Sequence, residues 1–175
     1  MIYGAGGRRP LRYRPTLPRT DITMTTSEIE VFLAEPRTLQ VATVGQDGFP
    51  HVAPMWYLIH EGNIAFRSFS KSQKITNLRR DPRLTVLAED GGSYGELRGV
   101  MIQGTARLIT DRAIMLDWFG QIAARYPFFG EEPTPPLDAD ANEAAFGRFA
   151  DKNTGVIVDP VKGISWDHRK LAGEY

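Results

Sequence analysis

Residues 63–83 read NIAFRSFSKSQKITNLRRDPR and predict a strand, a turn and a short helix in that order. We expect the strand over 63–69 and the helix over 75–80, with a turn rich in serine and lysine between them. Pro82 ends the helix, because a proline moves the residue before it out of the α region. The order places the start of a helix directly after the end of a strand.

The start of this helix predicts a binding site for an anion. A helix N-terminus presents unpaired backbone N–H groups and a partial positive charge. Ser72, Lys74 and Arg67 surround that position in the sequence. The combination predicts a cradle for a phosphate group, and therefore a phosphorylated cofactor.

The segments on both sides read as short strands joined by tight turns. Apolar residues alternate with small or polar ones over 39–44, and the Asp-Gly pair at 47–48 supplies the positive φ of a hairpin turn. Further strands are expected over 51–60, 84–88, 97–109, 155–160 and 161–166. Gly99 and Gly104 are expected at bends of the longest one. With one helix inserted after the third strand, this order predicts a mainly β fold, a six- or seven-stranded antiparallel split barrel with flanking helices.

Three more helices are expected. A capping box of Thr25 and Glu28 predicts a helix that ends near residue 35. Asp111 caps a second helix, which should end near residue 125 and carry its apolar side chains on one face. A third is expected over 141–150.

Composition limits the classes of function. The 175 residues suit one domain over 25–175, preceded by a basic leader over 1–24 that we expect to be disordered. The leader holds five arginines, but the formal net charge of the chain is zero, so we do not expect nucleic-acid binding. The lack of cysteine excludes disulfides and thiolate metal sites and fits the cytoplasmic location that we expect. No apolar run reaches the ~18 residues of a membrane span, and the three histidines lack a metal-binding spacing.

Several segments resemble one known family when they are taken in order. These segments lie between residues 28 and 109 and include DGFPHV at 47–52, PMWY at 54–57, GNIAF at 62–66, KITNLRRDPRLTV at 74–86 and VMIQGTA at 100–106. The ordered set resembles the split-barrel flavin and deazaflavin oxidoreductases of the pyridoxamine-phosphate oxidase superfamily.

Within that superfamily the run over 74–83 most resembles the class that uses the deazaflavin coenzyme F420. Ser72, Gln73 and Lys74 stand where the phosphate-oxidase branch typically has Ser-Arg-Lys. This departure argues against pyridoxamine phosphate as the substrate.

The resemblance implies a cofactor site in two parts. The residues that would hold the phosphate lie around the helix start: Arg67, Ser68, Ser72, Gln73 and Lys74. The residues that would hold the flat ring lie on the second strand: His51, Pro54, Met55 and Trp56. Trp166 would close the pocket from the other subunit of a homodimer.

The homodimer is expected because the family builds its cofactor groove between two barrels. A set of aromatic residues also predicts more apolar surface than one small barrel covers: Trp118, Phe119, Tyr126, Phe128 and Phe129.

The implied activity is hydride transfer from reduced F420 to a small organic acceptor, whose identity the sequence leaves open. Tyr57, His51 or solvent would supply the proton. An FMN-dependent oxidase or reductase is the alternative in the same fold. A non-catalytic carrier of F420 or haem is a further alternative.

Overall fold

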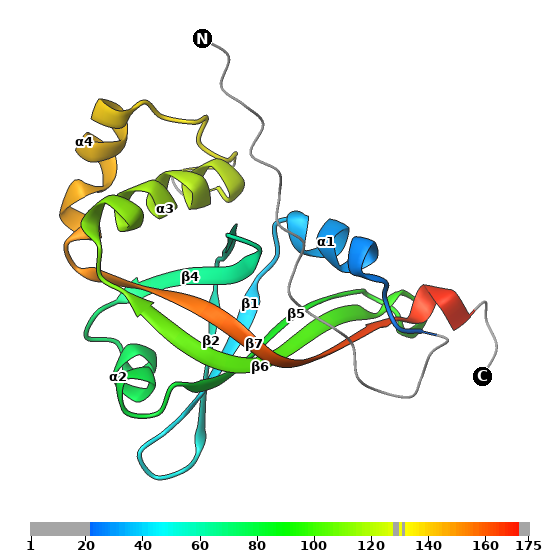
Figure 1. Ribbon diagram of the computed structural model, residues 1–175. Helices are drawn as coiled ribbons and strands as arrows, with labels where there is room; N and C mark the ends of the chain where they lie inside the picture. The colour runs from blue at the N-terminus through cyan, green and yellow to red at the C-terminus, as the bar shows by residue number, and fades with distance from the viewer. Residues whose placement is uncertain (1–21, 128–129, 131, 172–175) are drawn as a thin grey trace.

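The computed structural model describes residues 22–127, 130 and 132–171, and a seven-stranded antiparallel sheet forms its centre. The strand order is β2-β1-β5-β6-β7-β4-β3. The strands are β1 (Leu39–Val44), β2 (Pro50–Met55), β3 (Leu58–His60), β4 (Asn63–Phe69), β5 (Arg83–Asp90), β6 (Arg98–Ile109) and β7 (Asn153–Asp167). The sheet curls into a half-barrel (Figure 1), which confirms the predicted mainly β split barrel.

Four α-helices flank the sheet, and all four were expected from the sequence. They are α1 (Thr26–Ala34), α2 (Gln73–Arg80), α3 (Arg112–Arg125) and α4 (Ala139–Ala150), with short 3₁₀ turns at Tyr94–Glu96 and His168–Leu171. The predicted capping box is present, because the Thr25 hydroxyl accepts from the Glu28 N–H at 3.3 Å and the Glu28 carboxylate accepts from the Thr25 N–H at 2.6 Å. The helices α2 and α4 each begin two residues earlier than predicted.

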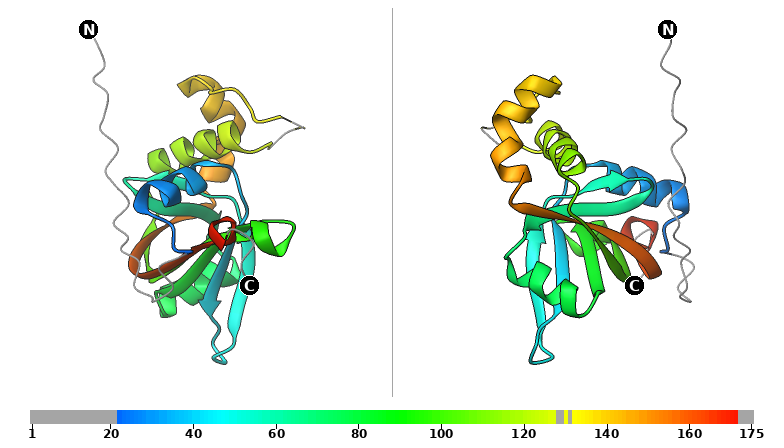
Figure 2. Two further views of the ribbon diagram at one scale, coloured as in Figure 1. Left: turned by 90° about the vertical axis from the view of Figure 1, so that its right-hand side faces the viewer. Right: turned by 60° about the vertical axis from the view of Figure 1, so that its left-hand side comes forward.

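The apolar side chains form two cores on opposite faces of the sheet. The inner core fills the half-barrel, where α1 inserts Ile29, Phe32 and Leu33. The outer core lies between the sheet and the pair of helices α3 and α4, which stack together on one side of the molecule (Figure 2). The hairpin of β1 and β2 projects at the end of the barrel away from that helix pair (Figure 2).

The outer core contains most of the aromatic residues from which the sequence predicts uncovered apolar surface. Trp118, Phe119 and Tyr126 are buried under α3 within a single chain. The inference of uncovered apolar surface is therefore wrong for these three residues. Phe128 and Phe129 lie outside the described residues. The homodimer itself stays a prediction.

The strand predicted over 51–60 is two strands on opposite edges of the sheet, β2 and β3. Tyr57 causes the break, because its side chain is fully buried and its hydroxyl donates to the Leu33 carbonyl at 3.0 Å. The chain therefore leaves the first edge after Met55 and joins the other edge at Leu58.

The two closing strands predicted over 155–160 and 161–166 are one long strand, β7. A register shift marks the predicted boundary: Gln103 pairs with Lys162 and Gly104 with Pro160, so that Val161 between them is an extra residue. The predicted irregularity at Gly104 is confirmed.

Gly99 has another reason to be glycine. A Cβ there would lie 2.3 Å from the indole ring of Trp166, its neighbour on β7. Close packing against this ring, rather than a bend, is what requires a residue without a side chain at position 99.

Candidate functional site

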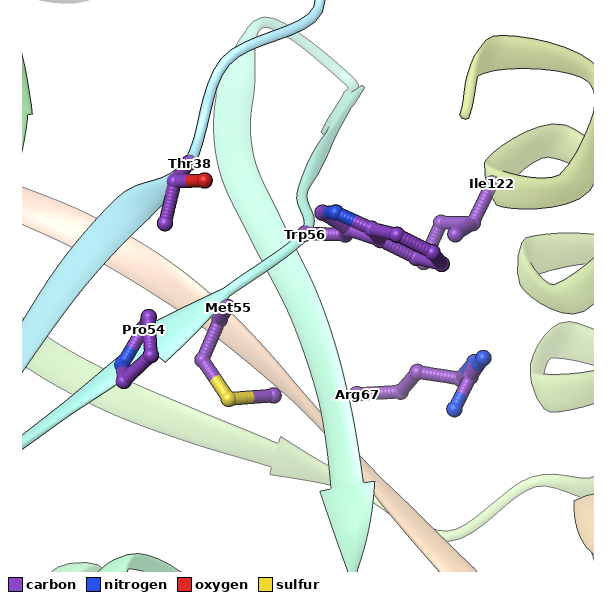
Figure 3. A pocket seen from close by; sticks show the side chains of 6 residues that line it. All are labelled: Thr38, Pro54, Met55, Trp56, Arg67 and Ile122. Atoms are coloured by element: carbon purple, nitrogen blue, oxygen red, sulfur yellow. The ribbon is translucent and has the colours of Figure 1, made fainter. Parts of the chain in front are cut away.

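Two hollows lie at opposite ends of β2. The first, which we call the α2 corner, has a volume of about 570 Å³ and is lined by the hairpin residues 45–47 and by Phe49, Pro50, His51, Gln73 and Asn77. The second, which we call the Trp56 groove, has a volume of about 280 Å³ and is lined by Thr38, Pro54, Met55, Trp56, Arg67 and Ile122 (Figure 3). Every residue predicted to hold the cofactor ring lines one of the two hollows.

The first turn of α2 brings together three of the residues predicted to bind phosphate. The Lys74 ammonium donates to the Ser68 hydroxyl at 3.2 Å, and the Ser68 and Ser72 hydroxyls lie 3.1 Å apart. The side chain of Ser72, the N-cap residue, makes no capping hydrogen bond, so it does not occupy the backbone N–H groups of the first turn. Burial lowers the pKa of Lys74 from its ordinary value. A cation, two hydroxyls and a helix start form a donor set suited to an anion.

The turn before α2 is fixed to the start of β7, the strand next to β4 in the sheet. The Ser70 N–H donates to the Lys152 carbonyl at 2.9 Å, and the Ser70 and Thr154 hydroxyls lie 2.8 Å apart. The Ser72 N–H donates to the Phe69 carbonyl at 2.9 Å. These bonds fix the point at which the helix begins relative to β4 and β7.

A buried amide, which sequence reasoning missed, connects α2 to the barrel wall. Asn77 is fully buried, and its Nδ2 donates to the Thr43 hydroxyl of β1 at 3.0 Å. Its Oδ1 accepts from Gln73 Nε2 at 2.9 Å. This chain of bonds orients the Gln73 amide at the corner. An asparagine between Ile75 and Leu78, on the buried side of a short helix, is the signal that could have revealed it, because buried amides require partners.

His51 supplies a second polar group to the α2 corner. Its Nδ1 atom is buried and has no hydrogen-bond partner among the residues that the structure describes. Buried polar atoms are almost always paired, so this nitrogen suits a hydrogen bond from or to a ligand. Among the described residues the lining of the corner includes the Asp47 carboxylate and no cation. The positive charge for a phosphate would therefore come from Lys74, which follows Gln73 at the start of α2.

The Trp56 groove has flat, mostly apolar walls. Trp56 stacks on Tyr126 with 5.0 Å between ring centroids and 9° between ring planes, which fixes the indole. Met55 and Arg67 line the same cavity as Trp56 and Ile122, and in Figure 3 both lie below these two side chains. The groove therefore offers an aromatic face, a thioether and one cation.

Arg67 lies apart from the other residues predicted to bind phosphate. Side chains alternate along a strand, so Arg67 faces the outer core while its neighbour Ser68 faces the barrel interior. The Arg67 guanidinium lies 3.4 Å from the Phe119 ring centroid and donates to Asn153 Oδ1 at 3.5 Å. Burial lowers its pKa to about 10, which leaves it cationic at neutral pH.

The lining of both hollows lacks the three residues at the start of α2, which are Ser68, Ser72 and Lys74, and it also lacks Tyr57 and Trp166. Tyr57 is fully buried, and burial raises its pKa to about 12, so we assign it a packing role and not that of a proton donor. Trp166 packs on Gly99, near the opposite end of β7 from Gly155, the partner of Arg67. It does not reach either hollow of its own chain.

Two kinds of feature are absent from residues 22–127, 130 and 132–171. No group of three or more His, Cys, Asp or Glu side chains there could hold a metal ion. Within the same ranges no helix is both long and apolar enough to cross a membrane.

Comparisons with known proteins agree with this architecture. The family model for pyridoxamine 5′-phosphate oxidase matches residues 25–146. A conserved hypothetical protein from Mycobacterium tuberculosis is 36% identical, with a TM-score of 0.81 over 91% of this chain and 95% of its own. No curated protein matches.

Two more distant structures share the fold. An F420 reductase is 21% identical, with a TM-score of 0.57 over 77% of this chain and 94% of its own. A heme storage protein from Vibrio cholerae is 16% identical, with a TM-score of 0.54 over 81% of this chain and 93% of its own. At these identities the likeness concerns the fold alone.

Proposed function

The chain belongs to the pyridoxamine 5′-phosphate oxidase family, and from this premise we propose that it is an oxidoreductase that uses coenzyme F420 to reduce a small organic acceptor. The observation that supports the proposal is the cluster of Ser68, Ser72 and Lys74 at the start of α2, a donor set suited to an anion, next to Gln73 of the α2 corner. The choice of F420 rests on the sequence run over 74–83, which forms α2 and the turn after it.

The cofactor would lie along the strand β2. His51 lines the corner and Met55 lines the groove, and four residues of strand span about 13 Å. An anionic tail at the start of α2 would place a flat ring over the far half of β2, against Pro54, Met55 and Trp56 in the Trp56 groove. Because Pro54 lacks an N–H donor and lies on an edge strand, the ring would meet an apolar surface there.

When bound, the reduced cofactor supplies a hydride to the acceptor, and one proton completes the two-electron reduction. The protein's contribution is to hold both molecules in contact and to limit the access of water. His51 is the remaining side-chain candidate for the proton, with solvent as the alternative, because Tyr57 is buried.

FMN is the second candidate cofactor. The sequence resembles a superfamily that includes flavin enzymes, the family model that matches is that of an oxidase by its name, and the donor set at the start of α2 would suit any phosphorylated ring cofactor. A carrier role for F420 or haem is compatible with the same fold, which the heme storage protein shares. The proposals differ in what binds and in whether anything is turned over.

We also propose that the protein forms a homodimer. The edge strand β2 exposes Val52, with 58% of its surface accessible, and the hairpin tip exposes Phe49, with 74% accessible. An apolar edge strand invites pairing with another chain. Sedimentation of the purified protein should give twice the chain mass of 19.6 kDa; a monomer at micromolar concentration would contradict the proposal.

The cofactor assignment is tested by titrating the purified protein with F420, FMN and haem. We expect F420 to bind at least tenfold more tightly than FMN or haem. Incubation with reduced F420 and a panel of enones and quinones should then oxidise the cofactor. Tighter binding of FMN would move the assignment to a flavin enzyme, and tight F420 binding without turnover would indicate a carrier.

A further inference from the structure

We propose that Tyr126 is a positioning residue for the Trp56 groove: its ring sets the plane of Trp56, and its hydroxyl ties together two sides of the groove. Tyr126 is not one of the described residues that line the groove, so it would act through Trp56 and Thr38, which do. The inference rests on the proposed function, in which a flat cofactor ring lies against this groove, and it names a residue that determines how that ring lies.

The ring of Tyr126 holds the indole of Trp56 in one orientation. The two rings are nearly parallel, with 9° between their planes and 5.0 Å between their centroids. Stacked rings at this separation attract each other beyond the area that they bury. Tyr126 is only 4% exposed and belongs to the outer core. Because a close-packed core leaves a buried ring little room to move, the stack fixes the orientation of Trp56.

The hydroxyl of Tyr126 connects the backbone on two sides of the groove. It donates to the Arg37 carbonyl at 3.0 Å and accepts from the Tyr57 N–H at 3.4 Å. One hydroxyl can fill both roles because it has one donor and two acceptor lone pairs. Arg37 precedes Thr38 and Tyr57 follows Trp56, so each bond fixes the chain next to a lining residue. The spacing between Thr38 and Trp56 therefore depends on this single side chain.

Tyr126 also connects these two sides to α3. It follows the last residue of the helix, and its N–H donates to the Ile122 carbonyl at 2.9 Å. Ile122 lines the groove as well, so walls from three separate segments of the chain meet at Tyr126. A flat ring would find these walls already in place, which reduces the entropic cost of orienting it.

The test compares two substitutions of Tyr126 with a matched control. Tyr126→Phe keeps the ring and removes the hydroxyl, and Tyr126→Leu removes both. Tyr94→Phe, the control, removes the hydroxyl of a tyrosine that is 54% exposed on the 3₁₀ turn Tyr94–Glu96.

Near-UV circular dichroism of the cofactor-free protein gives the first readout. The signal of Trp56 is the difference between each protein and the same protein carrying Trp56→Phe. This signal requires fixed side-chain packing, so it should fall in Tyr126→Phe, be lost in Tyr126→Leu and stay unchanged in Tyr94→Phe.

Calorimetric titration with F420 gives the second readout, with FMN used instead if only FMN binds the wild-type protein. Tyr126→Phe should bind the cofactor roughly three- to tenfold more weakly than the wild type, because the hydrogen bonds that fix the walls are lost. Tyr94→Phe should bind it as the wild type does.

The circular dichroism comparison uses no cofactor, so it decides the role of Tyr126 even if neither cofactor binds and the proposed function fails. An unchanged Trp56 signal in Tyr126→Phe would overturn the proposal, and so would equal cofactor affinities of Tyr126→Phe and Tyr94→Phe. Tyr126→Phe keeps the buried ring, so it decides the matter alone if Tyr126→Leu does not fold.

Discussion

Replacing Asn77 by alanine tests whether a buried amide fastens α2 to the barrel wall. The substitution removes two hydrogen bonds, one to Thr43 at 3.0 Å and one from Gln73 at 2.9 Å. Each contributes about 0.5–1.5 kcal/mol to stability, so the loss is about 2 kcal/mol. The better helix propensity of alanine offsets roughly 0.6 kcal/mol. The net loss is then about 1.5 kcal/mol, which lowers the melting temperature by roughly 3–6 °C for a chain of this size.

Thr76→Ala is the matched control for this experiment. Thr76 is the adjacent residue on α2, is exposed, and gains a similar amount from helix propensity. Urea unfolding of both variants measures the difference, which should be about 2 kcal/mol in favour of Thr76→Ala. If the two variants unfold at the same urea concentration, the Asn77 bonds do not hold the helix in place.

A double-mutant cycle localises the effect. Thr43→Val removes the hydroxyl that accepts from Asn77 and keeps the shape of the side chain. The two substitutions should be coupled by about 0.5–1.5 kcal/mol, because each destroys the same bond. Strict additivity would mean that Asn77 acts through packing and not through Thr43.

Three further predictions concern stability. Tyr57→Phe removes the hydrogen bond to Leu33 and should lower the free energy of unfolding in urea by about 0.5–1.5 kcal/mol. The pH profile of the reaction should stay unchanged, and a shifted profile would restore Tyr57 as a proton donor. Gly99→Ala should cost about 1–3 kcal/mol, because its Cβ would meet the Trp166 ring at 2.3 Å, and an unchanged melting curve would show that the ring moves freely. The side chain of Arg169 holds the pKa of Asp167 below its usual range, so this carboxylate stabilises the fold above about pH 4 and the benefit is lost as the pH falls further. Asp167→Asn should therefore lose less stability than the wild type between pH 5 and pH 3, and identical acid sensitivity would contradict this.

Local patterns predicted most of the fold. The alternation over 39–44, the capping box at Thr25 and the glycine turn at 47–48 each depend on neighbouring residues, and all are present. The break inside 51–60 could not be predicted in the same way. It arises because Tyr57 finds a buried acceptor on α1, a contact between distant residues.

The candidate site shows the same difference between contacts of neighbouring residues and contacts of distant ones. Ser68, Ser72 and Lys74 are close in sequence, and the turn and helix bring them together as expected. The separation of Arg67 from Ser68 follows from strand alternation, so the sequence contained that information. The Trp56 groove, by contrast, needs Ile122 from α3 and depends on how α3 packs over the sheet.

The most direct test of the central claim compares Lys74, at the start of α2, with Lys71, in the turn before the helix. Lys74 takes part in the proposed anion site, and Lys71 is exposed in the same turn. Calorimetric titration with F420 should show that Lys74→Ala binds roughly ten- to a hundredfold more weakly than the wild type, because a charge-assisted hydrogen bond contributes about 1.5–3 kcal/mol. Lys71→Ala should bind as the wild type does. Equal affinities for the two variants would contradict the claim that the start of α2 holds the cofactor's phosphate.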